Sequence, residues 1–213
     1  MCKLYYYPGN ANLAPHMLLE ELGVEYELVL VDRERDAHHS AEYLKLNPNG
    51  RIPTLVDGEL VLYEAAAICL HLVDRHPQAG LAPAVGTAER AHFYKWLVYL
   101  TNTLQAELLT YFYPERLTDD STAVAQVKAH AEARVGAMLD LIENTLAEND
   151  GPYLLGARYS AADPYLLMLS RWTRMMHHPA RNRLHLGRYL HMLLERPAIR
   201  RAFEQEGLGE PLF

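Results

Sequence analysis

The sequence predicts a mixed α/β domain followed by an all-helical domain. Strand-like and helix-like segments alternate over residues 1–77, whereas from residue 88 onward only long amphipathic helical patterns remain. Between the two parts, residues 78–87 hold Pro83 and two glycines with little periodicity, which is typical of a linker. We therefore expect an α/β domain over 1–77, a linker over 78–87 and a helical bundle domain over 88–213.

The first half begins with a strand, a helix and a second strand. Lys3–Tyr7 is short and aromatic, which favours a strand. Leu13–Leu22 carries apolar residues at helical spacing and stops at Gly23, a good C-terminal signal. Because Tyr26–Val31 again reads as a strand, the two strands are expected to pair in parallel through a right-handed crossover.

A proline loop and a hairpin complete this half. The charged segment Asp32–Ser40 reads as a loop, and Ala41–Leu46 as a short helix. Asp57-Gly58 between two apolar runs indicates a hairpin. Pro53 belongs at the mouth of the first hairpin strand because it cannot donate a ladder hydrogen bond. With a last helix at Ala65–His76, the order of the unit is β-α-β-α-β-β-α.

The second half is expected to be helical throughout. The candidate helices are Ala88–Tyr113, Thr122–Glu148, Ser160–His177, Leu184–Leu194 and Ala198–Gln205. Ser160 and Asp163 form a variant capping box, in which Ser160 accepts from a backbone N–H and Asp163 reaches back.

Composition excludes several classes of function. The net charge is -7 with neutral histidine, and no basic run is present, which argues against nucleic-acid binding. Cys2 and Cys69 do not make a disulfide framework and fit inert thiols in a reducing compartment. No apolar run approaches the roughly 18 residues of a membrane span, and the N-terminus lacks a signal-peptide pattern. We expect a soluble, cytoplasmic protein without a membrane partner.

Four sequence features, in order, resemble those of the soluble glutathione S-transferases. Residues 4–9 (Leu-Tyr-Tyr-Tyr-Pro-Gly), residues 47–58 and Glu64 resemble the thioredoxin-like half of that family. The box at residues 160–163, after Leu-Leu-Gly, is similar to the folding signature of the family's helical domain. The N-terminus is most similar to bacterial beta-class members. The resemblance covers nearly the full length and implies a homodimer that uses glutathione as co-substrate.

The resemblance also implies where a thiol-activating group would lie. In the family a Tyr, Ser or Cys after the first strand stabilises the glutathione thiolate, which is the nucleophile. This chain offers Tyr6, Asn10 and Asn12 as catalytic candidates. Asn10 follows Pro8-Gly9, as the Ser of Ser-type members does, and its amide can donate to a thiolate. The alternatives are turn chemistry for the asparagines and strand packing for Tyr6.

Further positions correspond to glutathione contacts of the family. The Ile52–Pro53 peptide is implied to be cis, with the backbone of Ile52 pairing with the cysteinyl part of glutathione. Glu64 and Ala65 occupy the place of a Glu-Ser pair that holds the γ-glutamyl end, so the serine hydroxyl is missing here. Arg35, or Arg33, is a candidate for the glycyl carboxylate, and an exposed loop charge is the alternative reading.

Two departures separate this chain from ordinary beta-class members. Their turn cysteine is Ala11 here, and their His-Lys pair on the first long helix is replaced by Gln105-Ala106. Gln105, Tyr111 and Tyr113 are candidates for a pocket that binds an apolar electrophile, with packing between the domains as the alternative. No metal site is expected, since the adjacent histidines of Met175–His178 lack further ligands.

The expected function is attack of bound glutathione thiolate on a small electrophile, as in detoxification. A peroxidase or disulfide reductase activity would be a variant of the same chemistry. The alternative is a non-catalytic member that keeps the fold as a ligand-binding or protein-interaction module. The dimer is expected to pair the first half of one subunit with the first long helices of the other, through Tyr63 and the face of Arg90–Lys95.

Overall fold

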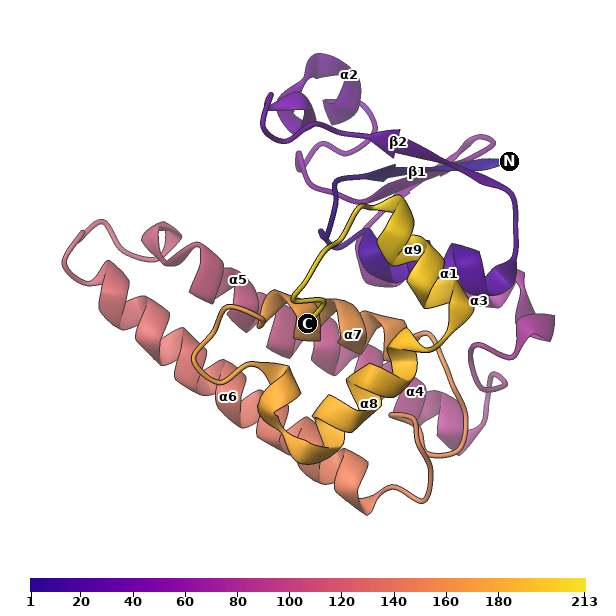
Figure 1. Cartoon of the computed structure of the whole chain (residues 1–213). Coiled ribbons are helices and arrows are strands. Elements are labelled where there is room, and N and C mark those ends of the chain that lie inside the picture. The colour runs from indigo at the N-terminus through magenta and orange to yellow at the C-terminus, as the bar shows by residue number, and fades with distance from the viewer. The chain divides into compact units, whose positions relative to one another are not determined.

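A computed structural model describes all 213 residues and divides them into two compact units (Figure 1). Unit 1 comprises Met1–Ala82 with Leu193–Glu210, and unit 2 comprises Pro83–Met192 with Pro211–Phe213. No helix in either unit combines the length and hydropathy that a membrane crossing requires.

Unit 1 contains the predicted β-α-β-α-β-β-α series. Its elements are β1 (Cys2–Tyr6), α1 (Leu13–Leu22), β2 (Tyr26–Leu30), the short 3-10 helix η1 (Ala37–His39), α2 (Ala41–Leu44), β3 (Thr54–Asp57), β4 (Leu60–Tyr63), α3 (Ala65–Arg75), the 3-10 helix η2 (Pro77–Ala79) and α9 (Pro197–Gln205). The sheet order is β2-β1-β3-β4, with β1 and β2 parallel and the other pairs antiparallel. The turn between β3 and β4 uses Gly58 at φ 62°, a left-handed conformation that glycine adopts without steric cost.

The core of unit 1 lies between the sheet and the helices on one side of it, where Figure 1 shows α1, α3 and α9. Every residue from Leu13 to Leu19 in α1 is buried, so this helix is covered around its circumference. Ile68, Cys69 and Leu72 of α3 are buried with it. Each fully buried Leu or Ile side chain contributes about 1.5–3 kcal/mol to folding, so α1 is the centre of this unit.

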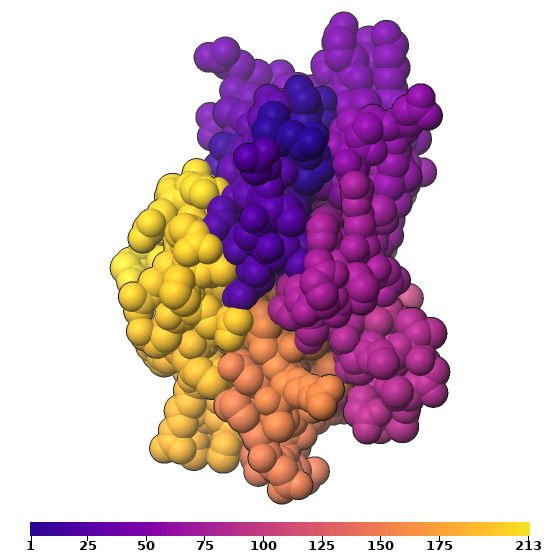
Figure 2. Space-filling model, turned by 90° about the vertical axis from the view of Figure 1, so that its right-hand side faces the viewer, coloured from indigo at the N-terminus to yellow at the C-terminus, as the bar shows by residue number.

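The last helix of the chain belongs to unit 1, which differs from the predicted boundary at residue 88. Ile199, Ala202 and Phe203 of α9 are buried. Arg196 donates to both carboxylate oxygens of Glu21 in α1, at 2.6 and 2.8 Å. Figure 2 shows residues 193–210 (yellow) against the N-terminal residues (indigo). An apolar face and a bidentate ion pair hold α9 on α1, and neither is visible as a boundary signal in the sequence.

Unit 2 is helical throughout, as predicted. Its elements are α4 (Ala88–Tyr99), the π-helical segment η3 (Leu100–Gln105), α5 (Ala106–Phe112), the 3-10 helix η4 (Pro114–Arg116), α6 (Val124–Glu148), α7 (Ala162–Trp172), the 3-10 helix η5 (Ala180–Asn182) and α8 (Leu184–Leu194), the end of which reaches unit 1. The predicted single helix Ala88–Tyr113 therefore contains a π-helical stretch, a deviation that is frequent at functional sites.

Helix α7 is shorter than its prediction of Ser160–His177. The hydroxyl of Thr173 donates to the carbonyl of Ser170 and accepts from the N–H of Ala180, and this side-chain bonding replaces further helical bonds. At the other end, Asp163 reaches back to the Ser160 N–H at 2.7 Å, as the capping box predicts. Ser160 Oγ accepts from the backbone N–H of Ala162, one residue earlier than the Asp163 N–H that a capping box uses.

Candidate functional site

The strand register of unit 1 brings three predicted glutathione-binding segments to one end of the sheet. Tyr5 in β1 pairs with Thr54 in β3, and Thr54 pairs with Tyr63 in β4. Three segments therefore lie at the same end of the sheet: the turn after β1, Ile52–Pro53 before β3, and Glu64 after β4. β2 also ends here because Tyr6 pairs with Leu30 in parallel, so the loop that carries Arg33 begins beside them.

Asn10 lies in the turn after β1 with its side-chain amide oriented by an arginine. Its backbone N–H donates to the carbonyl of Tyr7 at 3.1 Å. Its Oδ1 accepts from Nη1 of Arg33 at 3.0 Å. Because a guanidinium group only donates, the oxygen must face Arg33, and the NH₂ group points elsewhere. The turn therefore carries an amide NH₂ group that does not face Arg33.

A buried carboxylate supports this turn from below. Glu206, which follows α9 and is 4% exposed, accepts from the N–H of Gly9 through Oε2 and from Nδ2 of Asn12 through Oε1, both at 2.8 Å. Its Oε1 also lies 2.8 Å from Nδ1 of His16, and both side chains of this pair are fully buried. The backbone next to Asn10 is thus fixed by a charge-assisted hydrogen bond.

Asn12 is part of this support and is separated from solvent. The side chain is fully buried. Its Oδ1 accepts from the N–H of Tyr7 at 3.2 Å, while its Nδ2 donates to Glu206. With both ends of the amide bonded inside unit 1, Asn12 supports the turn after β1 from within the core.

Tyr6 ends β1 and is half-buried. Burial, together with the nearby charge of Glu206, raises the pKa of its hydroxyl above the ordinary value. The hydroxyl therefore stays protonated at neutral pH and can act only as a hydrogen-bond donor or a packing group.

The loop before β3 is held by polar side chains. Tyr43, in α2, and Asn47 both donate to the carbonyl of Arg51, at 2.6 and 2.7 Å. The Ile52–Pro53 peptide bond is cis, the isomer that the resemblance implied. Pro53 is buried and Ile52 is half-buried, so the backbone of Ile52 lies at the edge of the sheet that also carries Asn10.

Glu64 has an unusual backbone conformation at the start of α3. Its φ of 72° and ψ of 111° lie in a region that non-glycine residues rarely occupy, and such strain clusters at ligand-binding positions. The Glu64 side chain is exposed and does not cap the helix. The N–H groups of the first turn, Ala65–Ala67, therefore have no side-chain cap. They form the positive end of the helix dipole.

The two arginine candidates differ in placement. Arg33 contacts Asn10, as described above. Arg35 is 87% exposed at its side chain and pairs with Asp32 at 3.4 Å. Arg33 is therefore built into the site, and Arg35 remains a surface charge of the same loop.

The predicted electrophile-pocket residues all lie in unit 2. Gln105 ends the π-helical segment, and its Oε1 accepts from the buried Tyr165 hydroxyl at 2.6 Å. Tyr111 is 9% exposed, with Lys128 Nζ 4.7 Å from its ring centre. Tyr113 follows α5 and carries the Arg116 guanidinium over its ring at 4.0 Å. Little of the Tyr111 side chain is exposed, whereas Gln105 is fixed by a hydrogen bond.

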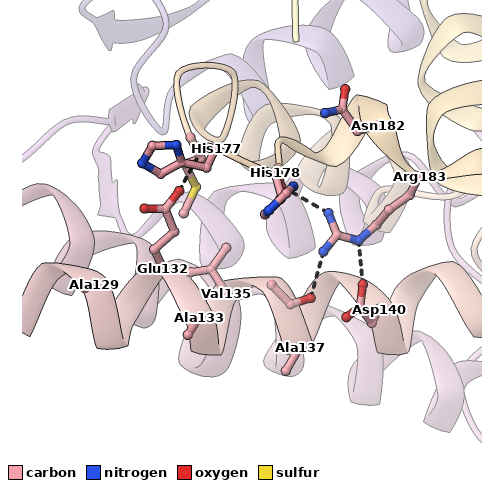
Figure 3. Close-up of a pocket in the computed structure, with 12 residues that line it drawn as sticks. Ala129, Glu132, Ala133, Val135, Ala137, Asp140, His177, His178, Asn182 and Arg183 are labelled. Atoms are coloured by element: carbon pink, nitrogen blue, oxygen red, sulfur yellow. Dashed lines mark hydrogen bonds and ion pairs between the residues drawn. The ribbon is translucent and has the colours of Figure 1, made fainter.

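A separate hollow of about 760 Å³ lies along α6 in unit 2 (Figure 3). Arg183 crosses it and donates to Asp140 at 2.8 Å and to the Gly136 carbonyl at 2.9 Å. His177 and His178 line the hollow, and Met176 is buried beside them. None of the predicted glutathione or electrophile residues is among its walls.

Three residues that contact the turn after β1 or support it were not recognised as a set from the sequence. These are Arg33 as the partner of Asn10, and His16 with Glu206 beneath the turn. His16 carried a usable signal, since a histidine within the apolar run Leu13–Leu19 requires a buried polar partner. Glu206 carried no such signal in the sequence, because it lies 190 positions from His16 in the chain.

Comparison with known proteins assigns both halves to one family. The family model "Glutathione S-transferase, N-terminal domain" matches residues 1–74, and "Glutathione S-transferase, C-terminal domain" matches residues 104–205. The chain is 28% identical over 208 residues to "Glutathione S-transferase GstA" of Escherichia coli O157:H7, covering 97% of this chain and 99% of that protein.

Solved structures agree with this result. A glutathione transferase homologue from Sulfitobacter with bound glutathione is 25% identical, with a TM-score of 0.88 over 98% of this chain and 99% of that one. The bacterial beta-class glutathione S-transferase of Sphingomonas chungbukensis is 29% identical, with a TM-score of 0.84 over 97% of this chain and 100% of that one.

Proposed function

Because the chain belongs to the glutathione S-transferase family, we propose that it binds glutathione at the sheet edge of unit 1 and activates its thiol for attack on a small electrophile. Glutathione is the co-substrate in this proposal, and the Sulfitobacter relative was solved with that molecule bound. The observation that carries the proposal is the orientation of Asn10, whose Oδ1 is occupied by Arg33.

The amide of Asn10 is the thiol-activating group in this mechanism. With Oδ1 bound to Arg33, the remaining NH₂ donates to the sulfur of glutathione and favours the thiolate over the thiol. Arg33 increases this effect because its positive charge polarises the amide and lies near the developing anion. Tyr6 contributes less, since its hydroxyl is half-buried at the end of a strand.

The other contacts bind the two ends of the tripeptide. The backbone of Ile52 pairs with the cysteinyl part as an added strand. The uncapped N–H groups of Ala65–Ala67 donate hydrogen bonds to the γ-glutamyl carboxylate at the positive end of α3. Glu64 offers a carboxylate beside that position for the ammonium group, and Arg35 is available to the glycyl carboxylate.

In unit 2, Gln105, Tyr111 and Tyr113 are the proposed contacts for the electrophile. An aromatic pocket suits an apolar substrate, and the fixed amide of Gln105 can donate to a polar leaving group. Conjugation is the main reaction that we propose, with peroxide or disulfide reduction as a variant in which the thiolate attacks oxygen or sulfur.

The proposal is tested by the pH dependence of conjugation of a generic aryl halide. Asn10→Ala should raise the apparent pKa of the bound thiol and lower kcat/KM at neutral pH by about ten- to a hundred-fold, the value of a hydrogen bond to a charged group. Asn10→Ser restores a donor and should recover part of the rate. Glutathione affinity, measured by calorimetry, should change much less.

Two results would count against this mechanism. If Tyr6→Phe alone abolished the rate, the hydroxyl and not the amide would activate the thiol. If the wild-type chain bound glutathione but showed no rate with several electrophiles, the non-catalytic ligand-binding function would take its place. That alternative is favoured by one observation, the alanine at position 65 where relatives carry a serine hydroxyl.

A further inference from the structure

The loop between β2 and α2 brings one carboxylate and two imidazole groups together. Asp36 Oδ1 lies 2.7 Å from His39 Nδ1 and 3.7 Å from His38 Nε2. The potential ligand atoms of all three residues lie within 4.8 Å of one another. The two imidazole rings lie side by side, with 4.0 Å between their centroids. None of these residues is among the candidate glutathione contacts described above.

The backbone of the loop holds this arrangement in place. Asp36 has a φ of 57°, in the left-handed region, and the N–H of Ala37 donates to the carbonyl of Asp32 at 2.9 Å. Asp36 precedes η1, but its side chain does not cap that helix and turns toward the histidines instead. Gly50 admits the ring of His39, because a Cβ at this position would lie 2.7 Å from the ring atom Cδ2.

His38 has ring nitrogens without hydrogen-bond partners. Its Nδ1 is buried without a partner, and its Nε2 is 3.7 Å from Asp36, too far for a hydrogen bond. The Asp36 carboxylate oxygen and His38 Nε2 therefore face one another without a hydrogen bond, at a separation that a cation bound to both atoms would fill.

We propose that Asp36, His38 and His39 form a binding site for a divalent transition-metal ion of the Zn²⁺ type. Imidazole nitrogens and a carboxylate oxygen are ligands that this class of ion prefers. Bonds of about 2.0–2.2 Å place neighbouring ligand atoms of a tetrahedral ion about 3.3–3.6 Å apart. The observed separations of 2.7 and 3.7 Å bracket this range, so small side-chain rotations complete the site.

The surroundings determine how tightly the ion is held. The side chains of Asp36 and His39 are 70% and 55% exposed, which leaves a coordination position for water. Arg33 opposes a cation through its charge, although its guanidinium is directed to Asn10. Three protein ligands with one opposing charge indicate an exchangeable ion with micromolar affinity, and not a closed structural site.

The test is calorimetric titration of the full, untagged chain with Zn²⁺ at neutral pH. We expect one ion per chain, with affinity at least ten-fold lower in His38→Gln and in Asp36→Asn. Asparagine tolerates the left-handed backbone at position 36, so the second variant keeps the loop conformation while it removes the charge. The matched control is the double variant His177→Gln, His178→Gln, an adjacent pair of exposed histidines in unit 2 that should not change the affinity.

Nuclear magnetic resonance of the imidazole groups provides a second measurement. It uses the wild-type chain, so it does not require that any variant folds. Addition of Zn²⁺ should shift the ring resonances of His38 and His39 before those of any other histidine. The proposal is overturned if wild type takes up no ion at micromolar concentration, if the loop variants bind as wild type does, or if the control pair loses binding instead.

Discussion

Asn10 and Asn12 are two positions apart, yet their side-chain amides have opposite surroundings. Asn10 bonds Arg33 through its oxygen alone, whereas Asn12 uses both amide ends inside unit 1. The sequence cannot separate them, since both follow the same Pro-Gly turn. The difference depends on Arg33 and Glu206, which come from distant segments.

The first prediction concerns Glu206. Glu206→Gln replaces the buried carboxylate that contacts Gly9, Asn12 and His16 with an amide of the same shape, and leaving buried polar partners unsatisfied costs about 1–3 kcal/mol. We expect the free energy of unfolding to fall by about 1–3 kcal/mol in denaturant titrations. The matched control, Glu204→Gln, changes an exposed neighbour and should leave stability within about 0.5 kcal/mol. Equal stabilities for the two variants would show that the buried pair adds nothing.

A second prediction concerns the missing hydroxyl at Ala65. Ala65→Ser adds a donor at the first position of α3, where the γ-glutamyl carboxylate is proposed to lie. A hydrogen bond to a charged group is worth about 1.5–3 kcal/mol, so glutathione should bind about ten-fold more tightly or better by calorimetry. Ala66→Ser, in the same helical turn, is the control and should have little effect. Unchanged affinity in Ala65→Ser would mean that the carboxylate is held elsewhere.

At the scale of elements, α1 and α9 are joined by a polar network that changes with pH. Tyr26, Arg201 and Gln205 all donate to the carboxylate of Glu20. Burial works to raise the pKa of Glu20, but these hydrogen bonds outweigh it and hold the pKa below its ordinary value. The network therefore contributes stability above the unfolded pKa, near 4.3, which is lost as the pH falls through the lower folded value.

Glu20→Gln should accordingly be less stable than wild type at pH 7, by about 1 kcal/mol. The difference should shrink as the pH falls below about 4.3, the unfolded pKa, because the unfolded chain then takes up a proton that folded Glu20 binds only at lower pH. Denaturant titrations of both proteins over this pH series provide the measurement. A difference that stayed constant down to pH 3 would mean that the carboxylate charge is not what stabilises the contact between α1 and α9.

The elements themselves were largely predictable, while their limits and partners were not. Strand alternation, the Asp57-Gly58 turn and helical spacing depend on local sequence, so β1 to β4 and α1 to α9 appear close to their expected positions. The π-helical stretch at Leu100–Gln105 and the early end of α7 depend on hydrogen bonds with neighbouring segments. Local motifs pointed to Asn10, Ile52 and Glu64 as candidates. The contacts of Arg33 and Glu206 join segments distant in sequence, so only the structure reveals them.

At the scale of the whole molecule, the chain leaves unit 1 at Ala82 and returns to it at Leu193. Unit 1 is therefore incomplete without the last helix of the chain, because Glu206 and Arg196 supply partners to α1 and to the turn after β1. Composition along the chain predicts a division at residue 88. The compact units do not follow that division because the chain returns to unit 1. Contacts distant in sequence decide which unit a helix belongs to.

The last prediction is that the protein is a homodimer, as the family resemblance implied. Arg90 does not serve as a contact, because it is 4% exposed and packs against Phe93 and Tyr94 within unit 2. Tyr94 and Val98, one turn apart on α4, are 42% and 55% exposed, and Val61 on the edge strand β4 is 40% exposed. Exposed apolar groups on an edge strand and a helix are the surfaces that association covers.

Val98→Arg introduces a charge that would be buried without a partner in such an interface, so it should convert the dimer to a monomer at micromolar concentration. Sedimentation equilibrium measures this directly. Leu117→Arg is the matched control, since Leu117 is 64% exposed but lies beyond α5, and it should leave the dimer intact. Circular dichroism should show the same helix content in both variants. A wild-type monomer, or a dimer that tolerates Val98→Arg, would place the association surface elsewhere or remove it.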